Sequence, residues 1–593
     1  MKKPLLVVIL IIFGLGIHFW IRHPALSLSY FHNEDTAGIA YSADLVMRGG
    51  LPFIDTVEIK APGSFFLLAQ WWSIFGRSLE NAQTLMFLWS FLAACGIAWG
   101  TWFLYGSVWA ASISGFLYLY LAPFTDSIDI NYGAWMITPY IFSATILWWI
   151  CREYNISGPS NNEMRSDPAT SFPVKKKKLA LWLTLGLLIS ISAVMKRQGA
   201  AIFPLSLWII YRFEYHRKPA FTLLLGGIVL GFSIFFFPYL KQGQLVDGLT
   251  NYFFSKSGWE YLASDLVKTT TSSVADTARL PRIWDGIVGI TVHLPLTGLL
   301  SLFVVIYNAL VHWDLSVKQK RVVLPKSSDR SLEKGNNGEF ITTEQVRKKS
   351  YLLEILLIYT LLSFIGTSLG LRFFKGYYLQ LLPAFIWLGV DPSVWRGSYL
   401  ASKSLFQKRI GYHQASLKLL IILFIIGLPF AVHSSWQHLD KARQMRSHPL
   451  YLPSWQIKEL SHAIQKESSP TDKIWVWGRW AWPSYFYTKR VSATRYFKNL
   501  GVLTTQLSNT WNPKRKSMPT RFNPQSPWRE AISELKQNKP LWIICAKNES
   551  YRQFKAFNQL LSEYYVSVSF KELKVKTRPN KPLFTVYRLK SKD

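Results

Sequence analysis

Long apolar runs separated by short polar segments make up the first three quarters of the chain. A helix needs about 17–25 predominantly apolar residues to cross the hydrocarbon core of a bilayer. About eleven runs approach this length, although several of them are short. They lie near residues 4–22, 83–105, 107–123, 133–151, 178–195, 199–213, 220–239, 286–311, 351–371, 376–390 and 416–432. The pattern predicts a polytopic α-helical membrane protein with about eleven transmembrane helices.

The first run, residues 4–22, follows the charged start Met-Lys-Lys. Both a signal peptide and an uncleaved first span have this layout. The run continues through Phe19, Trp20 and Ile21 without a small-x-small cleavage site. We therefore expect it to remain in the protein as the first span.

Basic residues gather in every second long loop between the apolar runs. The basic loops lie near residues 152–177, 212–219, 312–350 and 391–415, whereas the loop near 124–132 contains no Lys or Arg. Cytoplasmic loops of membrane proteins carry such an excess of Lys and Arg. The basic loops are therefore expected in the cytoplasm, and an odd number of spans places the C-terminal region outside it.

The C-terminal region differs from the rest of the chain because its apolar runs are short. Four of them are typical of strands, near residues 474–477, 541–545, 565–568 and 583–587. Helical patterns lie between them, near residues 454–467, 527–537 and 550–562. Strands that alternate with helices predict a small α/β domain. We expect a transmembrane domain at 1–432 and an extracytoplasmic α/β domain at 433–593.

Composition and charge are consistent with this division. Half of the 593 residues are hydrophobic and 16% are aromatic, which is unusual for a soluble protein of this length. The net charge of +33 comes from basic residues in the loops, and no nucleic-acid-binding module accompanies it, so nucleic acid is not an expected partner. The three cysteines lie far apart in the sequence and show no metal-ligand spacing and no disulfide framework.

The loop after the first run, residues 23–82, is too long for a plain connection; we call it the first outer loop. Its segment Thr36 to Arg48 carries apolar residues at helical spacing, and Gly49-Gly50 follows as a stop signal. Ser64 to Phe75 is short and strongly apolar. Both segments are expected to be interfacial helices lying on the membrane surface.

Two charged residues of the first outer loop are candidates for chemistry. Asp35 stands just before the first expected helix, where it is either an N-cap or a general base that accepts a proton from an acceptor. Lys60 is either a lysine that extends to the membrane interface or a ligand of a lipid phosphate. Spacing alone leaves both pairs of alternatives open.

The second outer loop contains Asp126 and Asp129. They either cap the following helix or join Asp35 around an acceptor or a divalent cation. The chain has no Asp-x-Asp motif at this position. We therefore expect no required cofactor, and a divalent metal stays possible but unsupported.

Two clusters of positive charge lie on the expected outer side, against the topology rule. One is Lys196-Arg197-Gln198-Gly199, and the other begins at Arg372 and includes Lys375. Either these residues pair locally with acidic groups, or together with Lys60 they bind an anionic lipid phosphate.

Five motifs together resemble those of bacterial GT-C glycosyltransferases, the relatives of the dolichyl-phosphate-mannose protein mannosyltransferases. The first outer loop supplies Asp35-Thr36-Ala37-Gly38, then Gly49-Gly50-Leu51-Pro52-Phe53-Ile54-Asp55, then Lys60-Ala61-Pro62-Gly63. Lys375 to Pro383 is similar to a late motif of the family, and Ile474 to Gly478 to the first strand of its outer domain. The chain departs from the family pattern at Thr36, Ala61 and Lys375, where Glu, Pro and His are usual.

The resemblance implies an inverting glycosyltransferase of a bacterial inner (plasma) membrane. Its donor would be a hexose or pentose linked to polyprenyl phosphate, and its acceptor a lipid-linked glycan, a lipid or a protein. Asp35 would be the base, and Asp126 and Asp129 candidates for contact with acceptor or metal. The donor phosphate would be bound by Lys60, Arg197, Arg372 and Lys375, with Tyr377 and Tyr378 as candidates for stacking on the sugar.

Two other classes of protein remain as alternatives. A lipid or glycan transporter or flippase is expected to bury ionisable residues within its spans. Expected spans two to four and seven contain no charged residue, which favours interfacial chemistry. A catalytically inactive GT-C homologue is the other alternative, because Thr36 replaces the usual Glu.

Overall fold

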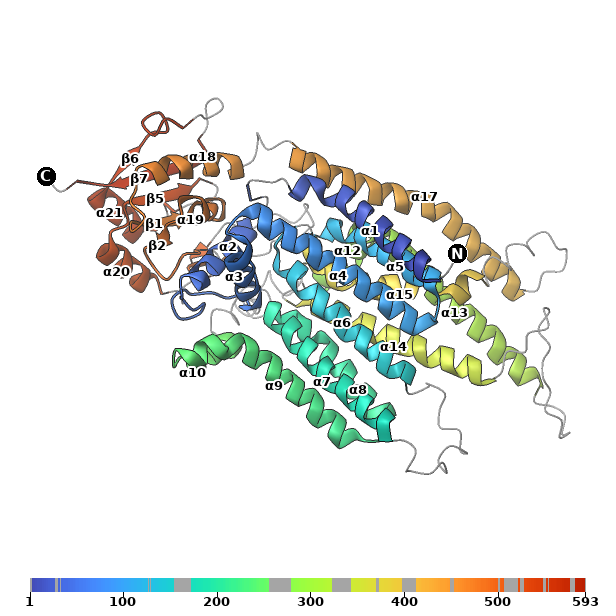
Figure 1. Ribbon diagram of the computed structural model, residues 1–593. Coiled ribbons are helices and arrows are strands. Elements are labelled where there is room, and N and C mark those ends of the chain that lie inside the picture. Colours follow the sequence, from blue (N-terminus) through green and yellow to red (C-terminus); the bar gives the residue numbers. More distant parts are fainter. Residues whose placement is uncertain are drawn as a thin grey trace.

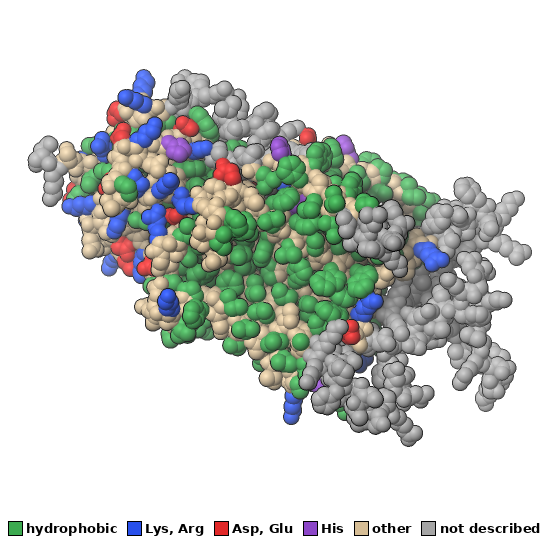
Figure 2. Space-filling view, in the orientation of Figure 1, with side chains coloured by type: hydrophobic (Ala, Val, Ile, Leu, Met, Phe, Trp, Pro, Cys, Tyr) green, Lys and Arg blue, Asp and Glu red, His purple; other side chains and the backbone are tan. Residues whose placement is uncertain are grey.

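The computed structural model has an elongated helical bundle at one end and a smaller domain of helices and strands at the other (Figure 1). It describes residues 3–26, 30–31, 34–125, 127, 129–153, 172–254, 279–322, 343–369, 373–396, 412–447, 453–499, 502–505, 521–522, 527–547, 551–552, 554–575 and 582–591. Figure 2 shows hydrophobic side chains covering the bundle, whereas charged side chains gather on the C-terminal domain. Such an extensive apolar surface is expected of a bundle that lies in lipid.

The bundle is built from helices of very different lengths. Its longer helices are α1 (Lys3–Leu26), α4 (Leu79–Tyr105), α5 (Val108–Leu121), α6 (Tyr132–Glu153), α7 (Phe172–Met195), α9 (Arg217–Lys241), α13 (Pro295–Val322), α14 (Thr343–Ser368) and α17 (Tyr412–Ser447). Among the described residues, six helices are long and apolar enough to cross a membrane, or seven if the bent pair α12 (Arg279–His293) and α13 forms one span. The chain is therefore an integral membrane protein.

The expected number of about eleven spans is higher than the described helices support. Two of the expected spans, 199–213 and 376–390, contain α8 (Phe203–Phe213) and α15 (Leu382–Gly389), of only 11 and 8 residues. Each follows a 3₁₀ turn, η4 (Arg197–Ile202) or η7 (Lys375–Gln380). At 1.5 Å per residue, such helices reach only about 12–17 Å, against a hydrocarbon core of about 30 Å.

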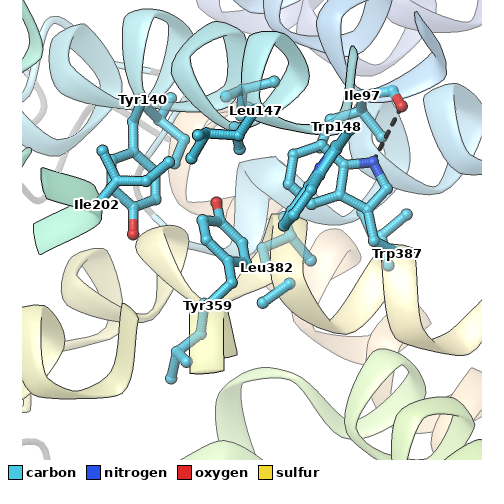
Figure 3. Packing of buried hydrophobic residues seen from close by; sticks show 14 of the residues in the cluster. Ile97, Tyr140, Leu147, Trp148, Ile202, Tyr359, Leu382 and Trp387 are labelled. Carbon is cyan, nitrogen blue, oxygen red and sulfur yellow. Dashed lines mark hydrogen bonds between the residues drawn. The ribbon is translucent and has the colours of Figure 1, made fainter. Parts of the chain in front are cut away.

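The apolar residues of α15 pack inside the bundle. The Trp387 indole donates a hydrogen bond of 3.1 Å to the carbonyl oxygen of Ile97 on α4, as Figure 3 shows. Its ring centroid lies 5.5 Å from those of Trp148 on α6 and Tyr359 on α14. Helix α15 is thus surrounded by protein, which accounts for its apolar composition.

Helices α7 and α9 pack so closely that the backbone of one contacts the backbone of the other at two glycines. A Cβ atom built at Gly186 would overlap the Leu224 carbonyl group, and one at Gly227 would overlap that of Leu183. Small residues permit such close packing of membrane helices.

Two helices occupy the expected segments of the first outer loop, α2 (Glu34–Met47) and α3 (Gly63–Phe75). Helix α2 contacts α3 and, from the C-terminal domain, α19 (Pro483–Thr488). Its apolar residues Ile39, Ala40 and Ala43 are fully buried, so this helix packs against protein. At the end of α3, by contrast, Ile74 and Phe75 are exposed.

The C-terminal domain is an α/β domain, as predicted. Its main sheet has the order β2-β1-β5-β7-β6, in which β1 runs parallel to β2 and β5, and β7 runs antiparallel to β5 and β6. The four expected strands are β1 (Lys473–Trp477), β5 (Trp542–Ala546), β6 (Tyr565–Val568) and β7 (Phe584–Leu589). The other elements are α18 (Pro453–Lys466), η10 (Arg479–Ala481), β2 (Val491–Ser492), the strand pair β3 (Thr504–Thr505) and β4 (Arg521–Phe522), α20 (Trp528–Asn538) and α21 (Lys555–Tyr564).

The C-terminal domain is attached to the first outer loop by hydrogen bonds along its length. The bonds join backbone and side-chain groups of the two regions. They run from Ser492 N to Tyr41 Oη (3.1 Å), from Phe31 N to Tyr487 Oη (3.0 Å), from Val57 N to the Arg495 oxygen (2.9 Å), and from Arg77 Nη2 to the Phe486 oxygen (3.0 Å).

Candidate active site

Asp35 lies in the first turn of α2, where its side chain is partly exposed. Because α2 begins at Glu34, Asp35 does not stand before the helix as expected for an N-cap. The unpaired N–H groups of a helix start give this region a positive potential, which stabilises a carboxylate. The neighbouring Thr36 side chain is buried.

Lys60 lies in the segment between α2 and α3, and its side chain is partly exposed. Its ammonium nitrogen is 5.7 Å from the ring centroid of Tyr132, the first residue of α6. Its backbone N–H donates a hydrogen bond of 3.1 Å to Glu58 Oε1. The Lys60 side chain therefore extends towards the start of α6, while the Glu58 carboxylate holds the Lys60 backbone.

Lys196 lies in the turn between α7 and η4, and its ammonium nitrogen is 4.3 Å from the ring centroid of Tyr377 on η7. Burial, together with repulsion from Lys60, lowers the pKa of Lys196 to about 7, and attraction to Asp35 opposes this change. The charges of Asp35 and Lys60 therefore both act on Lys196. Sequence reasoning assigned the phosphate-binding role to the next residue, Arg197.

The Arg197 side chain is directed to backbone oxygens. It donates hydrogen bonds to the carbonyl oxygens of Ile59 (3.2 Å) and Tyr252 (2.6 Å), and its guanidinium carbon lies 5.2 Å from the Tyr252 ring centroid. Tyr252 belongs to α10 (Leu245–Phe254). Arg197 thus connects the Lys60 segment to α10, and its binding of a donor phosphate stays a prediction.

The two expected cationic clusters meet in the structure. The Gln380 side chain on η7 donates a hydrogen bond of 3.0 Å to the carbonyl oxygen of Gln198. On the same turn, Lys375 is exposed, whereas Tyr378 is fully buried with its hydroxyl 2.9 Å from the Gly286 oxygen. Tyr377 therefore lies on the side of Lys196, while the ring of Tyr378 packs in the core.

Asp129 is buried in the loop between η1 (Ala122–Thr125) and α6. Arg22 of α1 binds this loop: its guanidinium donates hydrogen bonds to the Ser127 carbonyl oxygen and, at 2.6 Å, to Ser90 Oγ on α4. Sequence reasoning missed Arg22, although an arginine at the end of an apolar run was the available signal. The buried guanidinium fixes the loop that carries Asp129.

Two predicted site residues, Asp126 and Arg372, lie outside the described residues. Within the part of the chain that the structure describes, no group of three or more His, Cys, Asp or Glu side chains is placed to hold a metal ion. We therefore derive no metal chemistry for the site. The described site consists of Asp35, Lys60, Lys196, Tyr132 and Tyr377, with Asp129 in the adjoining loop.

No family model matches the sequence, and a search of curated proteins finds no match either. Solved structures do match. ArnT from Cupriavidus metallidurans bound to undecaprenyl phosphate is 13% identical with a TM-score of 0.50, over 99% of this chain and 98% of that chain. The Archaeoglobus fulgidus oligosaccharyltransferase tethered with an acceptor peptide is 12% identical with a TM-score of 0.50, over 95% of this chain and 72% of that chain. The chain therefore has the GT-C fold of membrane glycosyltransferases.

Proposed function

We propose that this protein transfers a sugar from a polyprenyl-phosphate-linked donor to an acceptor outside the cytoplasm. The acceptor is a lipid-linked glycan, a lipid or a protein, and the transferred sugar is a hexose or a pentose. The observation that carries the proposal is a carboxylate, Asp35 in the first turn of α2, whose charge acts on Lys196 together with that of Lys60. The two ammonium groups lie over the rings of Tyr377 and Tyr132. A direct displacement that releases a lipid phosphate needs a base and a cationic phosphate site close together.

In the proposed reaction, an acceptor oxygen or nitrogen attacks the anomeric carbon of the sugar. The bond between this carbon and the phosphate oxygen breaks, and its electron pair leaves with the polyprenyl phosphate. Asp35 accepts the proton that the acceptor loses. Attack opposite the leaving group inverts the anomeric centre.

The two lysines act on the leaving group in this proposal. Negative charge grows on the phosphate as the bond breaks, and preorganised ammonium groups stabilise that charge. Tyr132 and Tyr377 hold the lysines in place through cation–π contacts at 5.7 and 4.3 Å, which are worth about 0.5–2 kcal/mol each. Arg372 and Lys375 are proposed as further phosphate contacts, and Asp129 as a contact for the acceptor.

The orientation in the membrane is also part of the proposal. Arg152, Arg212 and Arg217 stand at helix ends of α6, α8 and α9. Figure 1 shows the α8–α9 turn at the end of the bundle opposite the C-terminal domain. The positive-inside rule assigns that end to the cytoplasm and hence the C-terminal domain to the outside of a bacterial inner membrane. The similarity in fold to ArnT bound to undecaprenyl phosphate supports a lipid-phosphate donor.

The test is a transfer assay with purified protein in detergent. Undecaprenyl-phosphate-linked pentoses and hexoses are supplied with membrane lipid extract as acceptor, and release of undecaprenyl phosphate is measured. Asp35→Asn keeps the shape of the side chain but removes the base, so the rate is expected to fall by about 10²–10⁴-fold.

The matched control for this test is Asp55→Asn in the same loop. Asp55 Oδ2 accepts a hydrogen bond of 2.6 Å from Leu51 N, so this carboxylate stabilises a turn. Its variant is expected to retain the parental rate. A parental rate in Asp35→Asn would remove Asp35 as the base, and no release from any donor would contradict the proposed function.

A further inference from the structure

Glu58 is a buried carboxylate that organises the segment containing Lys60. Its side chain is completely inaccessible to solvent. Oε1 accepts hydrogen bonds from the backbone N–H groups of Ile59 (2.8 Å) and Lys60 (3.1 Å). Oε2 lies 2.5 Å from the ammonium nitrogen of Lys498 and 3.5 Å from Ser42 Oγ on α2. A buried charge of this kind is tolerated only when it is paired and hydrogen-bonded, and Glu58 is both.

The partner ammonium comes from the other domain. Lys498 follows β2 in the C-terminal domain, and only 6% of its side chain is exposed. Its ammonium also lies 4.9 Å from the Phe497 ring centroid and 5.6 Å from that of Trp482. To reach Glu58 it crosses α2 at Gly38, where a Cβ atom would stand 2.5 Å from Lys498 Cε. The absence of a side chain at Gly38 thus leaves the path that the lysine occupies.

The Lys60 segment is consequently held from two sides. The C-terminal domain holds it through Lys498 and through the Arg495 carbonyl oxygen, which accepts a hydrogen bond of 2.9 Å from Val57 N. The bundle holds it through Arg197, which donates to the Ile59 oxygen. The position from which the Lys60 side chain extends therefore depends on the docking of the C-terminal domain.

We propose that the Glu58–Lys498 ion pair is a positioning device, through which the C-terminal domain sets the place of Lys60 for a lipid phosphate. The pair acts on Lys60 through the hydrogen bonds from the Ile59 and Lys60 backbone N–H groups to Glu58. This inference rests on the proposed function, because it presupposes that Lys60 binds the phosphate. It adds that the phosphate site is complete only when the two domains are docked.

The test measures the affinity of the full-length purified protein for undecaprenyl phosphate in detergent. Lys498→Met removes the charge at similar length, and Glu58→Gln retains an oxygen for the two backbone N–H groups. Each variant is expected to weaken binding by about tenfold or more, the usual size for loss of a group that orients a ligand-binding residue. The double variant is expected to bind no more weakly than either single variant, because both changes break one pair. Lys498→Arg is expected to restore most of the affinity.

The matched control is another buried contact between the domains. Arg77 pairs with Asp44 at 2.5 Å and donates to the Phe486 oxygen of the C-terminal domain at 3.0 Å. Its contacts among the described residues are with Asp44, Phe486 and Trp72, and none of these belongs to the Lys60 segment. Arg77→Met is expected to lower the melting temperature of the protein but to leave the affinity for undecaprenyl phosphate unchanged.

Gly38→Ala provides a second variant should Lys498→Met fail to fold. Its methyl group displaces Lys498 without changing any charge, and alanine favours a helix more than glycine does. It is expected to weaken binding as Lys498→Met does. Parental affinity in Gly38→Ala, or in the folded Lys498→Met and Glu58→Gln proteins, would overturn the inference. If Lys60→Met lost affinity in the same experiment, the proposed function would still stand. Parental affinity in Lys60→Met, or no binding by the parent, would overturn both.

Discussion

The pKa of Lys196 makes a prediction about how donor affinity depends on pH. Burial and the neighbouring Lys60 lower this pKa to about 7, so the ammonium loses its proton within the physiological range. A lysine with a lowered pKa is charged below that value and neutral above it. If the charged form is needed to hold a lipid phosphate, affinity is greatest at acid pH and falls as pH rises through 7.

The size of the effect follows from the titration. With a pKa near 7 in the free protein, the charged fraction is about nine tenths at pH 6, one half at pH 7 and one eleventh at pH 8. The apparent affinity for an anion that requires the ammonium is therefore about tenfold lower at pH 8 than at pH 6. The phosphate itself gains charge over this range, since its second pKa is about 6, and this change has the opposite sign.

The assay that separates the two titrations compares the parent with Lys196→Arg. The guanidinium stays charged at every pH used, so this variant reports the titration of the phosphate alone. The ratio of the two dissociation constants for undecaprenyl phosphate, measured from pH 5.5 to 8.5, is expected to change by about tenfold between pH 6 and pH 8. Removing the repulsive neighbour with Lys60→Met is expected to shift this transition to higher pH. Parallel profiles in the parent and Lys196→Arg would refute the reasoning.

Two further predictions concern packing and the second outer loop. Gly227→Ala places a methyl group against the Leu183 carbonyl group and is expected to destabilise the bundle by about 1–3 kcal/mol, measured as a lower melting temperature in detergent. Gly226→Ala, whose Cβ would lie 3.8 Å from Leu183 Cδ1, is the control and should melt as the parent does. Arg22→Met frees the loop at Ser127 and is expected to reduce kcat/KM in the transfer assay by about tenfold. An unchanged kcat/KM in that variant would contradict the positioning of this loop by Arg22.

The strands of the C-terminal domain were predictable because of where they lie in the sheet. The β1 residues Ile474 to Trp477 and all five residues of β5 are buried, so both strands are continuous apolar runs. Strand β2, by contrast, has only two residues, Val491 and Ser492, both partly exposed. A pattern so short carries no periodicity, and the sequence gives no sign of it.

Fewer of the described helices are long enough to cross a membrane than the hydropathy pattern predicted, because hydropathy does not distinguish lipid from protein interior. In the expected span 199–213, residues Ile202, Leu205 and Ile209 are fully buried. The whole of α15 is buried as well. An apolar segment surrounded by other helices has the same composition as one surrounded by lipid. Only its length in the folded chain, interrupted here by 3₁₀ turns, separates the two cases.

The adjacent cations Lys196 and Arg197 illustrate what sequence cannot resolve within a site. Both stand in one short motif, and the family resemblance implied the arginine as the ligand of the donor phosphate. The turn at the start of η4 directs Lys196 to Tyr377 and Arg197 to backbone oxygens of Ile59 and Tyr252. Neighbouring side chains in such a turn point in different directions, so their roles follow from the backbone and not from spacing.

The Glu58–Lys498 pair was beyond reach of the sequence, because its two residues are 440 positions apart. The energetics of buried charges nevertheless explain why this position holds an ion pair, although an apolar contact would also fill the space. A buried ion pair adds little net stability, but it strongly disfavours any arrangement in which one partner is left alone. An apolar contact tolerates small shifts of one domain on the other, whereas Glu58 and Lys498 permit only the docking geometry in which their charges meet. We therefore expect the pair to contribute more to the accuracy with which Lys60 is placed than to the free energy of unfolding.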